Sequence, residues 1–241
     1  FYAILYFKKS LCMAILKEEI IGGQRIILGD CLRVMPLLGY FDAVVTDPPY
    51  GINQDGGNFR GRKGGGARVL PKKSWDKERP SKEIFDLIFS TSDHQIIWGG
   101  NYFADLLPPS RGWLYWSKLM GGDFADGELA YTSLDCVLRQ FTLCNKMKGK
   151  IHPTQKPDDL IKWCINRLPK NTKTKIDPFL GSGKTLVSCE KLGLQGTGIE
   201  LDQDYFEAAC KRVDEAARQP SLFCAKISEN EEMKQGMLFD G

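Results

Sequence analysis

The chain has 241 residues, of which 42% are hydrophobic and 26% are charged, an ordinary composition for one globular domain. The net charge of +3 excludes a polycation, so any contact with nucleic acid must depend on where the positive charge is concentrated. Eight cysteines without a C-x-x-C pair and only two histidines exclude a zinc site of the usual spacing, and we predict no metal.

The same counts bear on the compartment and on the domain boundaries. Scattered cysteines suit a reducing cytoplasm, and no apolar stretch approaches the roughly 20 residues that cross a bilayer, so we expect a cytoplasmic protein without membrane contact. The chain begins with Phe1, and Met13 could be the natural start, so we expect residues 1–12 to be a non-native or disordered extension. One domain should then cover residues 13–218, followed by a flexible tail over 219–241.

Two strands are predicted near the N-terminus. Residues 24–28 form the first, which Gly29 and Asp30 close, and a short helix follows through residue 37. Residues 43–46 form the second, which stops at Asp47-Pro48-Pro49-Tyr50 because proline cannot continue a ladder. We therefore expect Asp47 and Tyr50 at the carboxyl edge of a sheet, where open α/β folds bind their ligands.

A glycine-rich basic loop is predicted directly after this turn. Residues 51–80 hold seven glycines and eight lysines or arginines against three acids, without periodicity. Basic side chains among glycines suit contacts with DNA phosphates, which give salt-dependent affinity but carry no sequence information. The predicted contacts are Arg60, Arg62, Lys63, Arg68, Lys72 and Lys73.

The remaining pattern alternates helices and strands. We predict helices over about 81–89, 157–168, 184–192 and 203–218, and strands over 95–98, 112–116, 135–143 and 196–199, with a further strand ending at Asp177. The strand over 135–143 could pair with a neighbour as a hairpin, and the rest of 117–150 is irregular. Alternating strands and helices favour a mainly parallel sheet with helices on both faces.

The glycine turn after Asp177 indicates a ligand site. The run Asp177-Pro-Phe-Leu-Gly-Ser-Gly-Lys-Thr185 gives a strand, a turn that lets a ligand approach the backbone, and a helix start that offers free N–H groups. A P-loop would need Gly at position 178, which is Pro, and the dinucleotide fingerprint fails at Leu186. A smaller nucleoside-type ligand remains, and Glu200, at the end of the next strand, is placed to bind ribose hydroxyls.

Three motifs together resemble a known family. Asp47-Pro-Pro-Tyr50, His152-Pro-Thr-Gln-Lys-Pro157 and the 177–185 run resemble S-adenosylmethionine-dependent DNA amino-methyltransferases, which methylate adenine N6 or cytosine N4. With the catalytic tetrapeptide before the cofactor motif, the order is similar to the circularly permuted β group. The resemblance implies a Rossmann-like, doubly wound sheet of about seven strands, mainly parallel, with an antiparallel hairpin strand.

The resemblance also implies the site residues. The catalytic turn would be Asp47, Pro48, Pro49 and Tyr50: Asp47 and the Pro48 carbonyl would accept the N–H groups of the target amine, and Tyr50 would stack on the base. The cofactor would contact Asp30 through its adenine, Glu200 through its ribose, Asp177 through its methionine and Lys156 through its carboxylate. The turn residues implied to line it are Phe179, Gly181, Ser182, Gly183 and Thr185.

The acceptor and the partners follow from the same reading. Asp at the head of the tetrapeptide favours adenine N6 of a flipped-out base in double-stranded DNA, with cytosine N4 as the alternative. A DNA-binding protein without catalysis is the alternative from another class. Residues 117–150 would form a small target-recognition region. Two tail segments, Gln219–Phe223 and Gln235–Phe239, resemble sliding-clamp-binding pentapeptides, and the sequence indicates no oligomeric state.

Overall fold

The fold is a three-layer α/β arrangement built on one large sheet. The structure, a computed structural model, describes residues 14–53, 57–58, 69–70, 76–119, 125–144 and 156–219. Nine strands form the large sheet in the order β1-β2-β11-β10-β3-β6-β8-β7-β9. They are β1 (Ile15–Ile21), β2 (Gln24–Gly29), β3 (Phe41–Thr46), β6 (Ser92–Trp98), β7 (Trp113–Ser117), β8 (Gly127–Thr132), β9 (Arg139–Thr142), β10 (Thr174–Asp177) and β11 (Gln195–Glu200).

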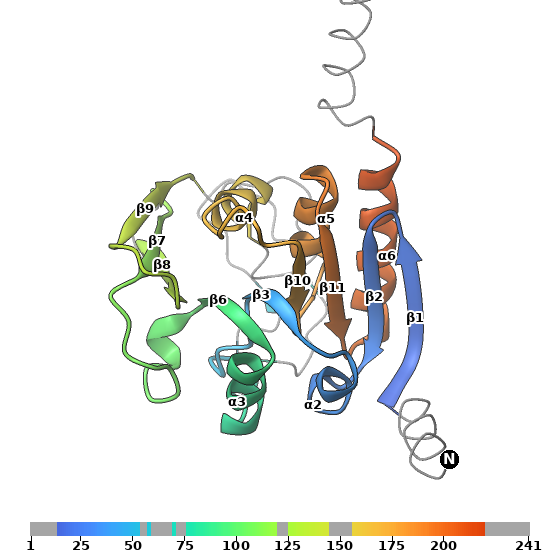
Figure 1. The fold of residues 1–241 in the computed structure, drawn as a ribbon, viewed down its shortest axis with the longest axis horizontal. Helices are drawn as coiled ribbons and strands as arrows, with labels where there is room; N and C mark the ends of the chain where they lie inside the picture. The colour runs from blue at the N-terminus through green and yellow to red at the C-terminus, as the bar shows by residue number, and fades with distance from the viewer. Residues whose placement is uncertain are drawn as a thin grey trace, which may run out of the picture.

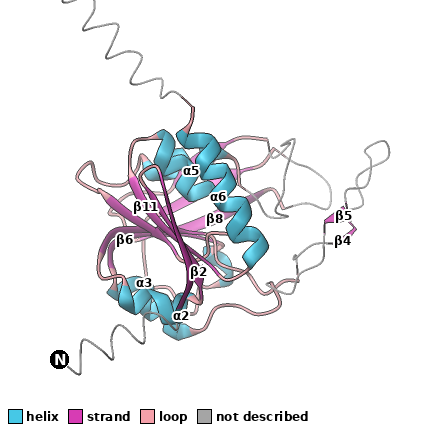
Figure 2. Cartoon of the chain, turned by 90° about the vertical axis from the view of Figure 1, so that its right-hand side faces the viewer, coloured by secondary structure: helices cyan, strands magenta, loops and turns pink. Residues whose placement is uncertain are grey.

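Helices cover both faces of this sheet (Figures 1 and 2). The α-helices are α2 (Cys31–Val34), α3 (Lys82–Ser90), α4 (Asp158–Ile165), α5 (Lys184–Lys191) and α6 (Gln203–Ala217), and short 3-10 turns are η1 (Met35–Leu37) and η2 (Gly100–Tyr102). One core packs α2 and α3 against one face, and two others pack α4, α5 and α6 against the opposite face. None of these helices is long and apolar enough to span a bilayer.

Helix α6 illustrates how local sequence produces these layers. The Asp202 side chain caps its start by accepting hydrogen bonds from two backbone N–H groups. Phe206, Ala209, Val213 and Ala216 follow at helical spacing, so they form one buried stripe that packs on Ile26 and Leu28 of β2. The remaining face of the helix is polar.

The parallel core of the sheet creates the ligand edge. Strands β2, β11, β10, β3 and β6 run parallel in that spatial order. After β3 the chain continues to β6 on one side, whereas after β10 it continues to β11 on the other side. The loops that leave β3 and β10 therefore diverge, and such a switch point is where open α/β sheets bind ligands.

The predicted α/β class and the mainly parallel sheet are confirmed. The predicted count of about seven strands is lower than the nine strands of the large sheet. Strand β1 was not predicted, because its lysine and glutamates obscure the alternation, yet it pairs with β2 through the Gly22-Gly23 turn. Strand β8 was assigned to irregular chain, although it pairs antiparallel with both β6 and β7. Strand β9 is shorter than predicted and lies parallel to β7 rather than in a hairpin.

Residues 51–80 were predicted to form a loop without secondary structure, but they contain two short strands. Strands β4 (Gly57–Asn58) and β5 (Val69–Leu70) pair antiparallel as a separate small sheet. Asp76 in this segment is buried. The six basic residues predicted to contact DNA, residues 1–13 and the tail from position 220 lie outside the described residues.

Gly99 shapes the turn that follows β6. Its backbone has a φ of +72°, and a Cβ placed there would lie 2.2 Å from the Tyr50 ring. Gly39 has a similar φ of +83° but open space around it. The two glycines share the conformational requirement, and only Gly99 also needs the space beside Tyr50.

We expect Gly99→Ala to lower the free energy of unfolding by about 1–3 kcal/mol more than Gly39→Ala does, because only the former adds overpacking to left-handed strain. Urea denaturation of both variants measures the difference. Equal losses would show that Tyr50 can move aside without cost.

Candidate active site at the ends of β3 and β10

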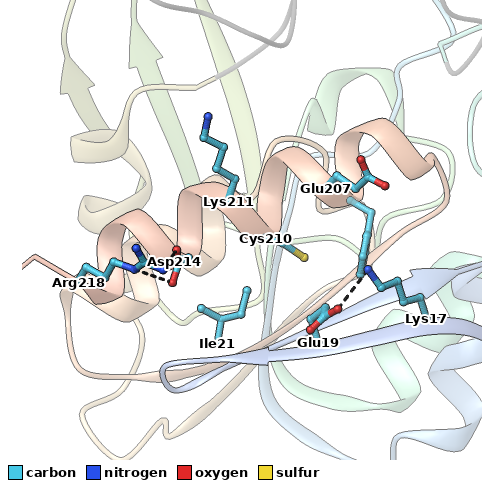
Figure 3. Close-up of a pocket in the computed structure, with 9 residues that line it drawn as sticks. Lys17, Glu19, Ile21, Glu207, Cys210, Lys211, Asp214 and Arg218 are labelled. Atoms are coloured by element: carbon cyan, nitrogen blue, oxygen red, sulfur yellow. Dashed lines mark hydrogen bonds and ion pairs between the residues drawn. The ribbon is translucent and has the colours of Figure 1, made fainter.

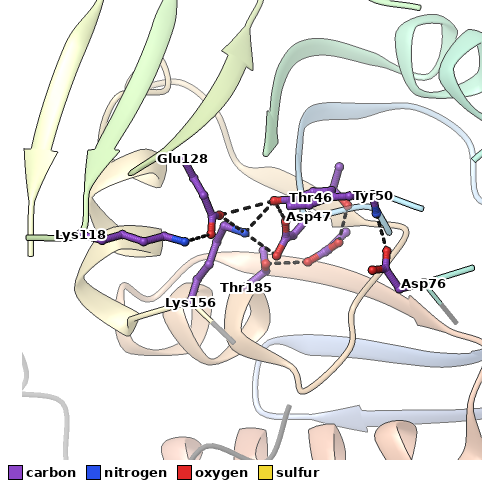
Figure 4. A network of polar contacts seen from close by, with 9 residues as sticks. Thr46, Asp47, Tyr50, Asp76, Lys118, Glu128, Lys156 and Thr185 are labelled. Carbon is purple, nitrogen blue, oxygen red and sulfur yellow. Dashed lines mark hydrogen bonds and ion pairs between the residues drawn. The ribbon is translucent and has the colours of Figure 1, made fainter. Parts of the chain in front are cut away.

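Asp47 follows β3 directly and lies at the centre of a polar network (Figure 4). Its Oδ2 is 2.5 Å from the ammonium of Lys156, and its Oδ1 accepts a 2.7 Å hydrogen bond from the Tyr50 hydroxyl. Lys156 also donates to the Tyr50 hydroxyl at 3.2 Å. Tyr50 and Lys156, which are 106 positions apart in the sequence, therefore meet at the Asp47 carboxylate, although the sequence predicted none of these contacts individually.

Glu128 extends this network from strand β8. Its Oε2 lies 3.1 Å from the Lys156 ammonium, and its Oε1 pairs with Lys118. Because β8 runs antiparallel to β6, the first residues of β8 lie at the same edge as the last residues of β6. Figure 4 shows the contacts running without a break from Lys118 through Glu128 and Lys156 to Asp47.

Burial and charge determine the ionisation of these groups. Desolvation raises the pKa of Asp47, although the Lys156 ammonium opposes the shift. Burial would raise the pKa of Glu128, but Lys156 and Lys118 outweigh it and hold that pKa at about 2. Burial alone would lower the pKa of Lys156, yet the two carboxylates raise it, so the lysine stays charged.

Tyr50 is fixed from three sides. Its backbone N–H and that of Gly51 donate to Oδ1 of the buried Asp76 at 2.7 and 2.9 Å. Its ring stacks on Tyr102 with centroids 4.7 Å apart and an interplanar angle of 16°. One face of the ring is therefore covered by the protein, and stacking of Tyr50 on a base remains a prediction.

Asp177 connects the end of β10 to the end of β3. Its Oδ1 accepts a 2.7 Å hydrogen bond from the Thr46 hydroxyl, and its Oδ2 accepts one of 2.6 Å from the Thr185 hydroxyl. The backbone N–H of Phe179 also donates to Oδ1 at 3.1 Å. Burial raises the pKa of this carboxyl to about 6, while the hydrogen bonds from Thr185 and Thr46 favour its ionised form.

The glycine turn after Asp177 is held by Glu200. The Gly181 N–H donates to Oε2 of Glu200 at 2.7 Å, and Oε1 accepts from the Asp202 N–H. Gly181 has a φ of +54° and Gly183 one of +81°, and a Cβ on Gly183 would meet Ala209 of α6 at 2.9 Å. Glycine at position 183 thus serves helix packing as well as the turn.

The structure brings the predicted residues into two adjoining groups. Asp47, Tyr50 and Lys156 form one, and Asp177, Thr185, Phe179, Gly181 and Glu200 form the other. Asp30 caps α2 by accepting from the Leu32 N–H at 3.0 Å, at the end of β2. Sequence reasoning gave no role to Thr46, Asp76, Lys118 or Glu128. Glu128 lies within residues 124–131, which resemble the family's segment beside the base pocket, and this resemblance is the signal that could have identified it.

A hollow lies apart from this site, between β1 and α6 (Figure 3). It has a volume of about 400 Å³ and is lined largely by charged side chains, including a 3.2 Å ion pair between Lys17 and Glu19. None of the predicted site residues lines it. The candidate site therefore remains the edge formed by β3 and β10.

Titration of Glu200 gives a test of this geometry without any ligand. Burial raises its pKa from an ordinary 4.5 to about 7, so the folded chain holds this proton more tightly than the unfolded chain. Ionisation of Glu200 should therefore destabilise the fold as the pH rises from about 4.5 through about 7. We expect the Tm of Glu200→Gln, relative to wild type, to increase over this interval.

Thermal unfolding followed by circular dichroism at several pH values measures this difference. Glu207→Gln, which changes an exposed glutamate of α6, serves as the matched control and should show a constant offset. A pH-independent offset for Glu200→Gln as well would contradict the buried, hydrogen-bonded placement of Glu200.

Similarity to known sequences agrees with the motifs. Residues 97–211 match the profile of a family described as DNA methylase, N6_N4_Mtase. The Type II methyltransferase M2.LlaDCHI of Lactococcus lactis subsp. cremoris is 28% identical over 152 residues, which cover 63% of this chain and 53% of that protein. M.HpaI of Haemophilus parainfluenzae is 39% identical over 71 residues, or 30% of this chain and 22% of that protein. The chain spans about half the length of curated relatives such as M2.LlaDCHI and M2.DpnII.

Solved structures agree in fold. The M1.HpyAVI–SAM complex has a TM-score of 0.56 at 17% identity and covers 79% of this chain and 99% of its own. The PvuII DNA methyltransferase, described as cytosine-N4-specific, has a TM-score of 0.55 at 15% identity and covers 82% of this chain and 89% of its own. Motif order, fold and sequence matches together make the chain similar to the S-adenosylmethionine-dependent DNA amino-methyltransferases.

Proposed function

We propose that the chain transfers a methyl group from S-adenosylmethionine to the exocyclic amine of a base in DNA, with adenine N6 as the acceptor. The observation that carries this proposal is the 2.7 Å hydrogen bond between Thr46 and Asp177. It joins β3, which the catalytic tetrapeptide follows, to β10, which the glycine turn follows. A base amine at Asp47 and a ligand on the turn would therefore be neighbours.

The chemistry of the turn fits the cofactor. S-Adenosylmethionine, when bound, supplies an electrophilic methyl group on a positively charged sulfur. Carboxylates at the ends of β2 and β11, Asp30 and Glu200, can accept hydrogen bonds from adenine and ribose donors. Phe179 offers apolar surface beside the glycine turn. These residues, with Gly181, Ser182 and Gly183, form the proposed binding site.

Asp47 would act on the amine itself. The lone pair of an exocyclic amine is delocalised into the ring, so the nitrogen is a weak nucleophile until it is oriented. By accepting one N–H, with the Pro48 carbonyl accepting the other, Asp47 favours a tetrahedral nitrogen whose lone pair faces the methyl group. The new C–N bond forms as the C–S bond breaks, sulfur keeps the electron pair, and the nitrogen then loses one proton.

Tyr50 and the rigid turn would hold the base. Flipping a base out of a duplex costs a few kcal/mol, and stacking on an aromatic ring returns about 1–3 kcal/mol. Since Tyr102 stacks on Tyr50, we propose that a base would stack on the opposite face of the ring. Pro48 and Pro49 restrict the turn, so little ordering entropy is lost on binding.

The acceptor base is the finer part of the proposal. Asp at position 47 favours adenine, since cytosine N4 members of the family more often carry Ser there. Cytosine N4 is the second candidate, because the fold of the PvuII enzyme, described as cytosine-N4-specific, matches this chain. Mass analysis of nucleosides from treated DNA distinguishes N6-methyladenine from N4-methylcytosine.

Double-stranded DNA is the proposed macromolecular partner. The basic residues Arg60, Arg62, Lys63, Arg68, Lys72 and Lys73 would contact its phosphates, and residues 117–150 would read the bases. Sliding-clamp binding through the tail segments remains a separate expectation. The alternative of a DNA-binding protein without catalysis is disfavoured, because Asp47 keeps charged and hydrogen-bonded partners suited to chemistry.

We expect Asp47→Ala to lower the methyl-transfer rate by at least about a hundredfold, because the amine loses its acceptor. Binding of S-adenosylmethionine should change little, since Asp47 lies on the base side of the turn. Transfer of a radiolabelled methyl group to genomic DNA and calorimetric cofactor binding measure the two effects. Asp86→Ala, an exposed acid of α3 paired with Lys82, is the matched control. Equal activity of Asp47→Ala and wild type would rule out this mechanism.

A further inference from the structure

Lys156 places a positive charge where the proposed reaction needs a negative one. Its side chain is only 3% exposed, and its ammonium is 2.5 Å from Asp47 and 5.1 Å from the centre of the Trp98 ring. Methyl transfer moves positive charge onto the base nitrogen beside Asp47. A buried ammonium that was neutralised by Asp47 alone would cancel the carboxylate that should stabilise this charge.

Glu128 supplies the second negative charge. Its Oε2 is 3.1 Å from the Lys156 ammonium, so the lysine is shared between two carboxylates. Glu128 also lies 3.5 Å from the Tyr50 hydroxyl, whereas its nearer contacts are the two lysines. Lys118 binds the opposite oxygen of Glu128 (Figure 4). The Lys118 ammonium also lies 5.2 Å from the centre of the Trp116 ring, so the position of the carboxylate is supported from both sides.

We propose that Glu128 is a positioning residue that acts through Lys156: it shares the ammonium, so that Lys156 does not fully neutralise the Asp47 carboxylate beside the base amine. This inference rests on the proposed methyl transfer. Asp47 touches the amine, Lys156 holds Asp47 and the Tyr50 hydroxyl in register, and Glu128 balances the charge of Lys156. Neither Lys156 nor Glu128 needs to contact the base.

A reversal experiment separates this role from direct contact. Glu128→Gln should lower kcat by about 10- to 100-fold while KM for DNA and for S-adenosylmethionine changes little, because the ammonium is left to Asp47 alone. Adding Lys156→Gln to that variant removes the ammonium that neutralises Asp47, whereas Lys118 stays beside position 128 in both variants. Because burial raises the pKa of Asp47, both variants are compared at a pH high enough to ionise it. The double variant should then be more active than Glu128→Gln, a recovery that additive damage to packing cannot produce.

Controls keep the result interpretable. The exposed pair Lys82 and Asp86 of α3 gives a matched cycle, in which Asp86→Asn with and without Lys82→Gln should leave kcat unchanged. Thermal unfolding of every variant checks that it folds. If Glu128→Gln does not fold, Glu128→Ala, which also removes the negative charge, takes its place in the cycle.

The outcomes are distinguishable. Partial recovery in the double variant supports the positioning role. A double variant as inactive as Glu128→Gln, or more so, in an otherwise active enzyme would overturn the role of Glu128 and leave methyl transfer intact. A wild-type chain that methylates no DNA would overturn the proposed function, and this inference with it.

Discussion

One buried carboxylate holds the two halves of the site together. Asp177 ends β10 and accepts hydrogen bonds from Thr46 on β3, from Thr185 on α5 and from the backbone of Phe179. A buried carboxylate without such donors would be strongly disfavoured. The fold therefore requires these partners at Asp177, and the hydrogen bonds also fix their orientation. The glycine turn and the catalytic turn both start within a few residues of this point, and their relative position follows from it.

The side chains around that junction are mainly charged rather than hydrophobic. Lys156, Asp47 and Glu128 are held in a setting where removal of any one would leave a partner uncompensated, which typically costs about 3–5 kcal/mol. Such groups are poor contributors to stability when compared with well-packed apolar residues. Their presence at one edge of the sheet indicates that this edge is organised for chemistry.

The strand-end rule explains which site residues could be predicted. Asp47 follows the apolar strand β3, and Asp177 ends a parallel strand directly before a glycine turn, so their meeting at one edge was predictable from the sequence. Glu128 lies at the start of β8, which is antiparallel, and the rule considers only the ends of strands. Its strand also has mixed polarity, with only its second half buried. The contact between Glu128 and Lys156 arises from long-range pairing that no local pattern encodes.

The same limits apply to the sheet edges. Strand β1 carries Leu16 and Ile20 on its exposed side, so its polarity pattern does not resemble that of a half-buried strand. Burial of Asp76 beneath the Tyr50 backbone was hidden because its neighbours in sequence are mostly charged and show no apolar periodicity. In both cases the tertiary partner, rather than local propensity, determines the conformation.

The separation of Thr46 and Asp177 along the chain has a kinetic consequence. These residues are 131 positions apart, so the pairing of β3 with β10 closes a very long loop and contributes to a high contact order. On a ribosome, the Asp47–Tyr50 turn is synthesised long before the glycine turn that completes its surroundings. Assembly of the site therefore coincides with the late, non-local step of folding, and a nascent chain that stops short of β10 carries only one of its two halves.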